Sequence, residues 1–249
     1  MAATYDSIGV GYAHVRRPEP RIAKQIAASL GSARRVLNVG AGAGSYEPAD
    51  RIVVALEPSQ RMIEQRPPDA SRLVIRGMAG ELPFPDGSFD AAMALLTVHH
   101  WPDPAAGLRE MRRVTTGPVV VFTFDYAVHS AQWLVTDYLP SMLELDTEVP
   151  SPSAIADALG GGEVIAVAVP HDCTDGFCHA WWRRPEAYLD PSVRAGISGI
   201  ARLPAADVSR GMALLADDLE SGAWRAAHAD LLDRTEIDAG YRLVVANGT

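Results

Sequence analysis

A glycine-rich stretch after a short apolar run is the part of the sequence best suited to hold a ligand. Residues 36–39 (Val-Leu-Asn-Val) lead into Gly40, Gly42 and Gly44, which are separated by single alanines. Glycines directly after a first strand let the backbone turn tightly and approach a ligand without a Cβ clash. Alone, the pattern also fits a flexible turn that binds nothing.

A carboxylate follows the next apolar run. Residues 53–56 (Val-Val-Ala-Leu) end at Glu57, 17 residues beyond Gly40. In doubly wound folds the second strand lies beside the first, so both strand ends face one crevice. A carboxylate there can accept hydrogen bonds from both hydroxyls of a ribose, although an isolated acid at a strand end can also simply face solvent. The two features together favour a nucleoside ligand.

The spacing of the glycines indicates which nucleoside. The dinucleotide fingerprint is GxGxxG, followed by a helix whose N-terminus faces a pyrophosphate. Here the third glycine comes one residue early, and residues 45–48 (Ser-Tyr-Glu-Pro) are a poor helix opening. We expect Glu47 to place negative charge near any phosphate. S-adenosylmethionine carries no phosphate and avoids that penalty.

The elements that must position these residues alternate between apolar runs and helical patterns. Strands are predicted at 35–39, 51–56, 72–75, 89–97 and 118–124, and helices at 20–30, 59–66 and 104–114. This alternation predicts an α/β fold built on a doubly wound, mostly parallel sheet.

The alternation ends after Asp125. Helices are predicted at 128–145 and 151–159, strands at 163–169 and 241–246, and a mostly helical region at 171–238. We therefore expect one domain over 1–249, with residues 1–30 forming an N-terminal lid and helix. Residues 126–150 and 171–238 are predicted to form a helical cap around the substrate pocket.

Composition limits the partners and the location. The chain has 249 residues, a formal net charge of −9 and one lysine, Lys24, which argues against nucleic acid as a substrate. No apolar stretch approaches the roughly 20 residues that cross a bilayer, and the first residues lack a secretory pattern. We predict a cytoplasmic protein that acts on a small molecule and not on membranes. The sequence does not predict an oligomeric state.

The two cysteines allow a metal interpretation, which we do not favour. Cys173 and Cys178 lie close to His171 and His179. Structural zinc sites usually show CxxC pairs or a well-separated histidine pair, and neither is present. The prediction is two free thiols and no metal.

Taken together, these segments resemble the class I S-adenosylmethionine-dependent methyltransferases, in particular the small-molecule subgroup that includes quinone-type methyltransferases. The resemblance covers residues 5 to about 125 and rests on four segments: 36–44, 53–66, 77–101 and 108–111. It implies a seven-stranded Rossmann-like sheet, S-adenosylmethionine as cofactor and S-adenosylhomocysteine as product.

The resemblance also implies a set of cofactor contacts. Gly40, Ala41 and Gly42 match the turn under the methionyl group, Glu57 matches the ribose-binding acid, and Ala79 matches an adenine contact through its N–H. The full set implied for the cofactor is Tyr12, Arg16, Gly40, Ala41, Gly42, Glu57, Pro58, Met62, Met78, Ala79, Leu96, Thr97 and Val98. The resemblance further implies a lid over the cofactor, formed by Tyr5, Asp6 and residues 12–16.

Two residues depart from the family pattern. Asn38 stands where an acid is commoner, so a charge attraction for the methionyl amine is lost. Met78 stands where many relatives have an Asp that accepts from the adenine amino group, and a thioether can only pack against the ring.

Methyl transfer from a sulfonium needs little acid–base chemistry, because the leaving sulfur becomes neutral and alignment supplies most of the catalysis. A base is needed only if the acceptor arrives protonated. His99 and His100 are the candidates, since they follow the fourth predicted strand at the mouth of the crevice. Either histidine could instead stabilise the loop or face solvent.

The predicted substrate pocket takes its residues from the end of the fifth strand and from the cap. Aromatic and basic side chains of this kind line pockets for small organic ligands, although tryptophans can equally anchor the cap. The candidates are Asp125, Tyr126, His129, Trp133, His179, Trp182 and Arg183. An arginine that reached inside would suit a carboxylate-bearing acceptor.

The sequence therefore predicts a methyltransferase that acts on a small molecule by in-line displacement. A non-catalytic or repurposed S-adenosylmethionine-binding protein is the alternative. A nicotinamide-dependent oxidoreductase is disfavoured by the glycine spacing.

Overall fold

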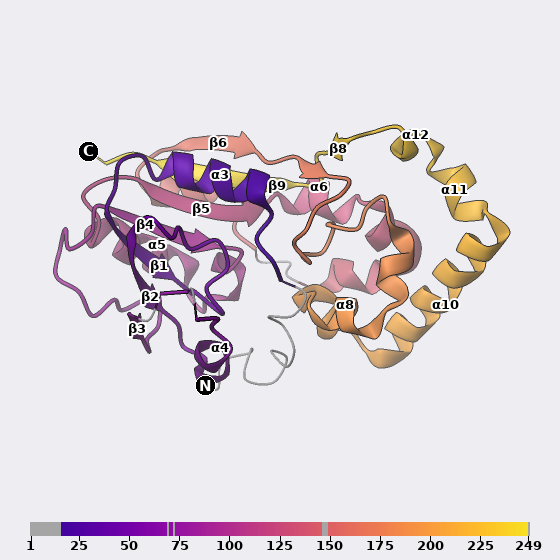
Figure 1. The fold of residues 1–249 in the computed structure, drawn as a ribbon, viewed down its shortest axis with the longest axis horizontal. Helices are drawn as coiled ribbons and strands as arrows, with labels where there is room; N and C mark the ends of the chain where they lie inside the picture. The colour runs from indigo at the N-terminus through magenta and orange to yellow at the C-terminus, as the bar shows by residue number, and fades with distance from the viewer. Residues whose placement is uncertain (1–15, 69, 72, 146–148, 249) are drawn as a thin grey trace.

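The computed structural model describes residues 16–68, 70–71, 73–145 and 149–248. Seven strands form one sheet in the order β3-β2-β1-β4-β5-β9-β6 (Figure 1). Their bounds are β1 Arg35–Val39, β2 Ile52–Leu56, β3 Val74–Ile75, β4 Ala91–Leu95, β5 Val119–Phe124, β6 Glu163–Ala166 and β9 Tyr241–Ala246. β1 to β5 pair in parallel, and β9 runs antiparallel to β5 and β6. The predicted seven-stranded, mostly parallel α/β sheet is confirmed.

The central strands are continuous apolar runs because both of their faces are covered. All six residues of β5 are buried. Val120 and Phe122 face one apolar cluster, and Val119 and Val121 face the other, as the two-residue period of a strand requires.

Helices cover both clusters. α3 (Pro20–Ser29) buries Ile22 and Ile26 against one face of the sheet. α5 (Pro104–Arg113) buries Leu108 and Met111 against the other, with α7 (Pro152–Ala158) beside it. Asp103 caps α5 by accepting a hydrogen bond from the Ala106 N–H, and proline occupies the first turn, so the helix begins at Pro104.

The connection from β1 to β2 contains no helix: residues 40–51 form turns. Tyr46 fills part of this side of the sheet, since it is buried and its ring meets the Phe122 ring edge-on, with centroids 6.3 Å apart. The next helix is the short α4 (Gln60–Glu64), which follows β2 and is capped by Ser59.

A helical cap lies beyond one end of the sheet (Figure 1). It contains α6 Tyr126–Ser130, η2 Leu134–Tyr138, η3 Pro140–Glu144, η4 Pro185–Leu189, α8 Pro191–Ala195, α9 Ser198–Ala201, α10 Ala205–Ser221, α11 Ala223–Ala227 and α12 Ala229–Leu232. The cap has an apolar core of its own, centred on Trp133, Leu139, Tyr188 and Leu215.

Three details of the sequence prediction were wrong. The helix predicted at 128–145 is broken into α6, the π-helical η2 and the 3₁₀-helical η3. The second of these breaks lies at Leu139, because Pro140 disfavours a helical residue before it. The strand predicted at 163–169 stops at Ala166. The short strands β7 (Val169–Pro170) and β8 (Glu236–Ile237), which form a separate two-stranded sheet, were not foreseen.

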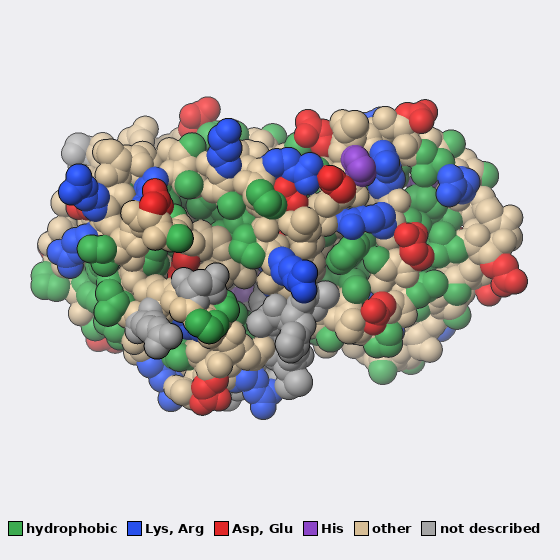
Figure 2. All heavy atoms as spheres, in the orientation of Figure 1, with side chains coloured by type: hydrophobic (Ala, Val, Ile, Leu, Met, Phe, Trp, Pro, Cys, Tyr) green, Lys and Arg blue, Asp and Glu red, His purple; other side chains and the backbone are tan. Residues whose placement is uncertain are grey.

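The surface and the helix lengths add two observations. On the face shown in Figure 2, acidic and basic side chains are interspersed. None of the described helices has both the length and the apolar character to cross a membrane.

Candidate functional site

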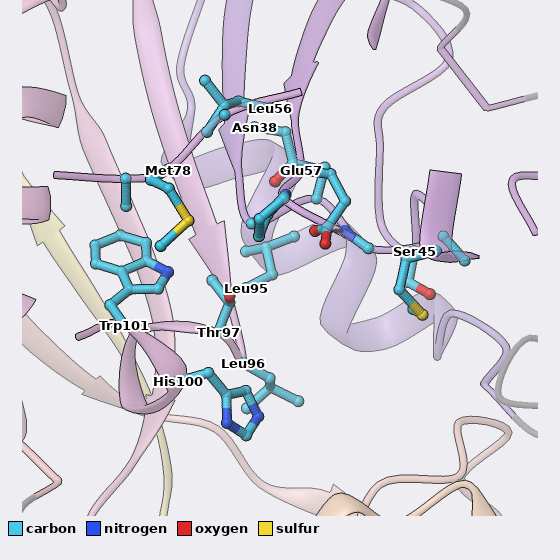
Figure 3. A pocket seen from close by; sticks show the side chains of 18 of the residues that line it. Asn38, Ser45, Leu56, Glu57, Met78, Leu95, Leu96, Thr97, His100 and Trp101 are labelled. Carbon is cyan, nitrogen blue, oxygen red and sulfur yellow. Dashed lines mark hydrogen bonds between the residues drawn. The ribbon is translucent and has the colours of Figure 1, made fainter. Parts of the chain in front are cut away.

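A cavity of about 540 Å³ opens at the carboxyl ends of β1, β2 and β4 (Figure 3). Eleven of the thirteen residues predicted to contact the cofactor line it: Arg16, Gly40, Ala41, Gly42, Glu57, Pro58, Met62, Met78, Ala79, Leu96 and Thr97. Val98 is buried at the start of η1 (Val98–His100) and is not part of the lining. Tyr12 and the part of the predicted N-terminal lid that falls in residues 1–15 lie outside the described residues.

The Gly40 turn lies directly against the tip of β4. Gly40 has a φ of +69°, which favours glycine, and a Cβ at this position would collide with the Thr97 side chain. The N–H groups of Gly40 and Ala41 both donate to the Leu56 carbonyl, so the turn is fixed against β2. Leu96, with a φ of +52°, is a non-glycine residue in the left-handed region at this point.

The Glu57 carboxylate connects the two loops that flank the cavity. One oxygen accepts from the Gly42 N–H at 2.8 Å and the other from the Ser59 N–H at 2.9 Å. Glu57 is only 5% exposed. Each carboxylate oxygen has a second lone pair, so the fixed carboxylate can also accept hydrogen bonds from a diol in the cavity.

Glu47 does not present a free charge to the cavity, contrary to the expectation from sequence. It pairs with Arg66 at 2.6 Å, and both side chains are at most 5% exposed. The Asn38 amide donates to Glu47 at 3.0 Å, and Arg66 also donates to the Gly42 carbonyl. A pyrophosphate is instead disfavoured by the missing helix after β1, since residues 40–51 offer no helix N-terminus to the cavity.

One polar atom of the Asn38 side chain is left without a hydrogen bond to any described residue. Asn38 lines the cavity and is 1% exposed, and its Oδ1 has no hydrogen-bond partner among the described residues. A buried, unsatisfied acceptor is costly, so this oxygen suits a ligand that brings a donor such as an ammonium group.

Two side chains form an apolar slot at the other end of the cavity. Met78 is 50% exposed and its side chain points toward the Trp101 ring (Figure 3). A Cβ on Gly107 would collide with that ring, so the glycine makes room for it. Sequence reasoning did not place Trp101 in the lining, and it also missed Arg76 and Pro102.

The two candidate bases face different spaces. Their rings are 3.9 Å apart, but His100 lines the large cavity whereas His99 lines a second one of about 70 Å³. Burial, followed by the neighbouring His100, lowers the pKa of His99 well below its ordinary value. His99 is therefore neutral at pH 7.

The second cavity lies between the tip of β4 and the cap. It shares Arg16 and Leu96 with the first, and it contains Tyr126 and His129 of the predicted substrate set. Asp125 instead caps α6, where its carboxylate accepts from the Ala127 N–H at 3.1 Å.

The other four predicted substrate residues line neither cavity. The indole N–H of Trp133 donates to the Trp182 carbonyl, and that of Trp182 donates to the Val169 carbonyl, each at 3.0 Å. Arg183 donates to the Arg234 carbonyl at 2.7 Å. A buried His179 ring nitrogen lies 3.0 Å from the His129 carbonyl.

Three potential metal ligands come together here in a combination that sequence spacing did not show. Nitrogen and sulfur atoms of His129, Cys178 and His179 lie within 4.8 Å of one another. The two imidazole rings are in contact, with centroids 4.2 Å apart and planes tilted by 58°, and burial raises the pKa of the Cys178 thiol to about 12. Burial also lowers the pKa of the His179 imidazole well below its ordinary value.

A buried ion pair joins the start of the described chain to the cap. Arg16 Nε donates to Asp175 at 2.6 Å, and the Tyr46 hydroxyl donates to the same carboxylate at 2.7 Å. Asp175 is completely buried. The N-terminal segment, the turn after β1 and the cap therefore meet at one carboxylate between the two cavities.

The chain is similar to known methyltransferases. A family model described as a methyltransferase domain matches residues 37–121. Demethylmenaquinone methyltransferase from Renibacterium salmoninarum is 37% identical over 116 residues, which are 43% of this chain and 48% of that protein. The chain thus spans about half the length of this curated relative.

Solved structures extend the similarity over nearly the whole chain. A candidate methyltransferase from an antibiotic biosynthesis pathway of Anabaena variabilis is 33% identical, with a TM-score of 0.86 over 93% of this chain and 98% of that one. Geranyl diphosphate C-methyltransferase from Streptomyces coelicolor, solved with S-adenosyl-L-homocysteine, shares the fold at 14% identity, with a TM-score of 0.51 over 92% and 77% of the chains.

The fold and the site define a nucleoside-binding α/β protein with a capped second chamber. With the similarity to the Anabaena protein over 98% of its length, this chain belongs to the class I S-adenosylmethionine-dependent methyltransferases. The cofactor of that family is S-adenosylmethionine.

Proposed function

We propose that this protein transfers the methyl group of S-adenosylmethionine to a small-molecule acceptor by in-line displacement. The observation that carries the proposal is the cavity at the ends of β1, β2 and β4, where a fixed carboxylate, Glu57, meets a glycine turn with no helix behind it. A phosphate-free nucleoside fits these features, whereas a pyrophosphate would lack its usual helix N-terminus.

The residues of the cavity suit the three parts of the cofactor. Glu57 would accept from the ribose hydroxyls, Asn38 Oδ1 would accept from the methionyl ammonium, and Met78 with Trp101 would enclose the adenine. Bound there, the cofactor supplies an electrophilic methyl group on a sulfonium. The turn at Gly40 and the Thr97 side chain would then hold the sulfur end at the tip of β4.

The proposal also covers the binding place of the acceptor, the base that acts on it and the location of the protein in the cell. The second cavity shares a wall with the first, which supports it as the place where an acceptor meets the methyl group. His99 or His100 would act as the base where the acceptor needs one. The net charge of −9 supports a substrate other than nucleic acid. We also propose a cytoplasmic location, on the grounds given by the sequence.

Replacement of Glu57 tests the cofactor site. Glu57→Ala should weaken binding of S-adenosylhomocysteine by about 2–4 kcal/mol, since two hydrogen bonds to a charged group are lost and the ribose hydroxyls are left unpaired. Isothermal titration calorimetry measures this change, with the exposed Glu81→Ala as a matched control. Parallel thermal unfolding separates a binding defect from a folding defect.

The same calorimetry compares S-adenosylmethionine with NAD⁺ on the unmodified protein. Binding of NAD⁺ without binding of S-adenosylmethionine would end the proposal. If Glu57→Ala bound S-adenosylhomocysteine with an unchanged dissociation constant, Glu57 would not be part of the site. The identity of the cofactor would then rest on the comparison with NAD⁺ alone.

A further inference from the structure

The second cavity has walls of a different chemistry from those of the cofactor cavity. Most of its described lining is apolar or aromatic and comes from both the sheet and the cap, including Phe124, Val135, Phe177 and Ile197. The cofactor cavity, in contrast, has Glu57 and Asn38 in its lining. The second cavity is thus a chamber for a molecule that is largely apolar.

Charge is balanced before any ligand enters. Among the described residues that line the second cavity, Arg16 is the one arginine, and the lining contains no lysine and no carboxylate. Its Nε and Nη2 donate to the buried Asp175 at 2.6 and 3.2 Å, and its side chain is 8% exposed. A carboxylate or phosphate group would have to compete with Asp175 for this cation, and a charged amine would find no carboxylate in the described lining. Burying an unpaired charge is costly, so the chamber favours an uncharged molecule.

The chamber is placed to reach the methyl group. It shares Leu96 with the cofactor cavity, and Leu96 directly precedes Thr97, which touches the Gly40 turn. The wall between the two spaces therefore lies at the tip of β4, beside the proposed position of the sulfur.

Two histidines, His99 and His129, line the chamber, and His99 is the one that follows the tip of β4, two residues after Thr97. It lines the cavity, its ring contacts His100 and Phe124, and neither ring nitrogen is hydrogen-bonded to a described residue. Nδ1 is buried without a partner. Burial keeps the imidazole neutral by lowering its pKa, which also makes it a weak base.

We propose that the chamber receives an uncharged, largely apolar acceptor that carries a hydroxyl of phenol or enol type, and that His99 takes the proton of this hydroxyl. The inference rests on the proposed methyl transfer. The acceptor oxygen forms the new O–CH₃ bond as the C–S⁺ bond breaks and its electron pair goes to sulfur. The O–H proton goes to the His99 imidazole and then to water. The products are a methyl ether and S-adenosylhomocysteine.

The acidity and the size of the acceptor follow from the chamber. A weak base acts best on a hydroxyl of moderate acidity, which excludes simple alcohols. A cavity of about 150 Å³ holds benzene, and this one has about 70 Å³, so a ring enters by its hydroxyl-bearing edge or displaces a wall side chain. Met142 is the adaptable member of the wall, because its thioether chain is unbranched.

Binding to the protein loaded with S-adenosylhomocysteine tests the acceptor class. Calorimetry with 4-cresol and with 4-hydroxybenzoate compares a methyl group with a carboxylate on the same phenol. We expect 4-cresol to bind about tenfold more tightly or better, and Ile197→Phe to weaken only 4-cresol. Equal or tighter binding of 4-hydroxybenzoate, or no binding of either phenol, would overturn the inference. Failure of S-adenosylhomocysteine itself to bind would instead overturn the proposed function.

Turnover tests the role of His99. With S-adenosylmethionine, 4-cresol should be methylated and benzyl alcohol should not, because its hydroxyl is far less acidic. His99→Gln should lower kcat about 100-fold or more, with the KM values for both substrates within about threefold of the unmodified protein. The matched control is His171→Gln, a histidine outside both cavities. Unchanged kcat in His99→Gln, methylation of benzyl alcohol at a similar rate, or bound 4-cresol that is never methylated would each refute the proton transfer.

Discussion

At the scale of single residues, the site depends on side chains that are already bonded before a ligand arrives. The two oxygens of Glu57 are fixed by N–H groups of Gly42 and Ser59. Little conformational entropy then remains to be lost when a ribose binds, since the carboxylate already points into the cavity. Met78 is the opposite case: its exposed thioether offers contact without a hydrogen bond.

Met78 leads to a prediction about the cofactor's base. Because a thioether does not accept a hydrogen bond of useful strength from the adenine amino group, the protein should bind N6-methyl-S-adenosylhomocysteine within about threefold of the unmodified compound. Met78→Asp should add a charged hydrogen bond and prefer the unmodified compound by about tenfold or more. Competition binding measures both ratios. Discrimination by the unmodified protein would show that another group reads the amino position.

Sequence spacing could predict the residues that follow strand ends, and not those that tertiary packing brings in. Gly40 and Glu57 are set by their positions along two consecutive strands, and both line the cofactor cavity. Ile197 enters the second cavity from the cap, and no local pattern reports that contact. Trp133 and Trp182 were predicted in the pocket, but aromatic residues give the same signal in an apolar core, where the structure places them.

At the scale of elements, the missing helix between β1 and β2 changes what supports the glycine turn. In its place, the buried Glu47–Arg66 pair and the Asn38 amide hold residues 40–51 against the sheet. The sequence predicted the poor helix opening from residues 45–48. It could not predict the ion pair, because Arg66 is brought back to Glu47 only by the packing of α4.

Arg66→Met should destabilise the protein by about 3–5 kcal/mol, because it leaves the Glu47 carboxylate buried without its partner. The double variant Glu47→Gln with Arg66→Met should regain a large part of this loss, since no unpaired charge remains. Chemical denaturation of the single and double variants measures the difference. A single variant as stable as the parent protein would show that Glu47 reaches water when Arg66 is absent.

At the scale of the whole molecule, buried acids join the N-terminal segment to the cap. Glu19 is completely buried and accepts from the Thr174 N–H at 2.9 Å and from Arg21. Its neighbour in space, Tyr46, donates to Asp175. The cap is thereby fixed to α3 and to the turn after β1 through these two carboxylates.

Glu19 predicts how stability depends on pH. Burial alone would raise its pKa, but hydrogen bonds from Arg21 and the Thr174 backbone outweigh burial and lower the pKa from 4.5 to about 2. A lowered folded-state pKa means that the stabilisation is present above pH 4.5 and is lost as the pH falls toward 2. The loss should be about 3 kcal/mol. Denaturation at several pH values should show this slope, and Glu19→Gln should remove it; an unchanged slope in that variant would assign the acid transition to other groups.

The separate apolar core of the cap has a consequence for how such proteins diversify. Side chains around Trp133, Tyr188 and Leu215 pack among themselves, apart from β1 and β2, the strands that directly precede Gly40 and Glu57. Substitutions in that half can therefore reshape the proposed acceptor chamber while the proposed site for the methyl donor stays intact. New substrate preferences can thus arise by drift in one half of the molecule under unchanged selection on the other.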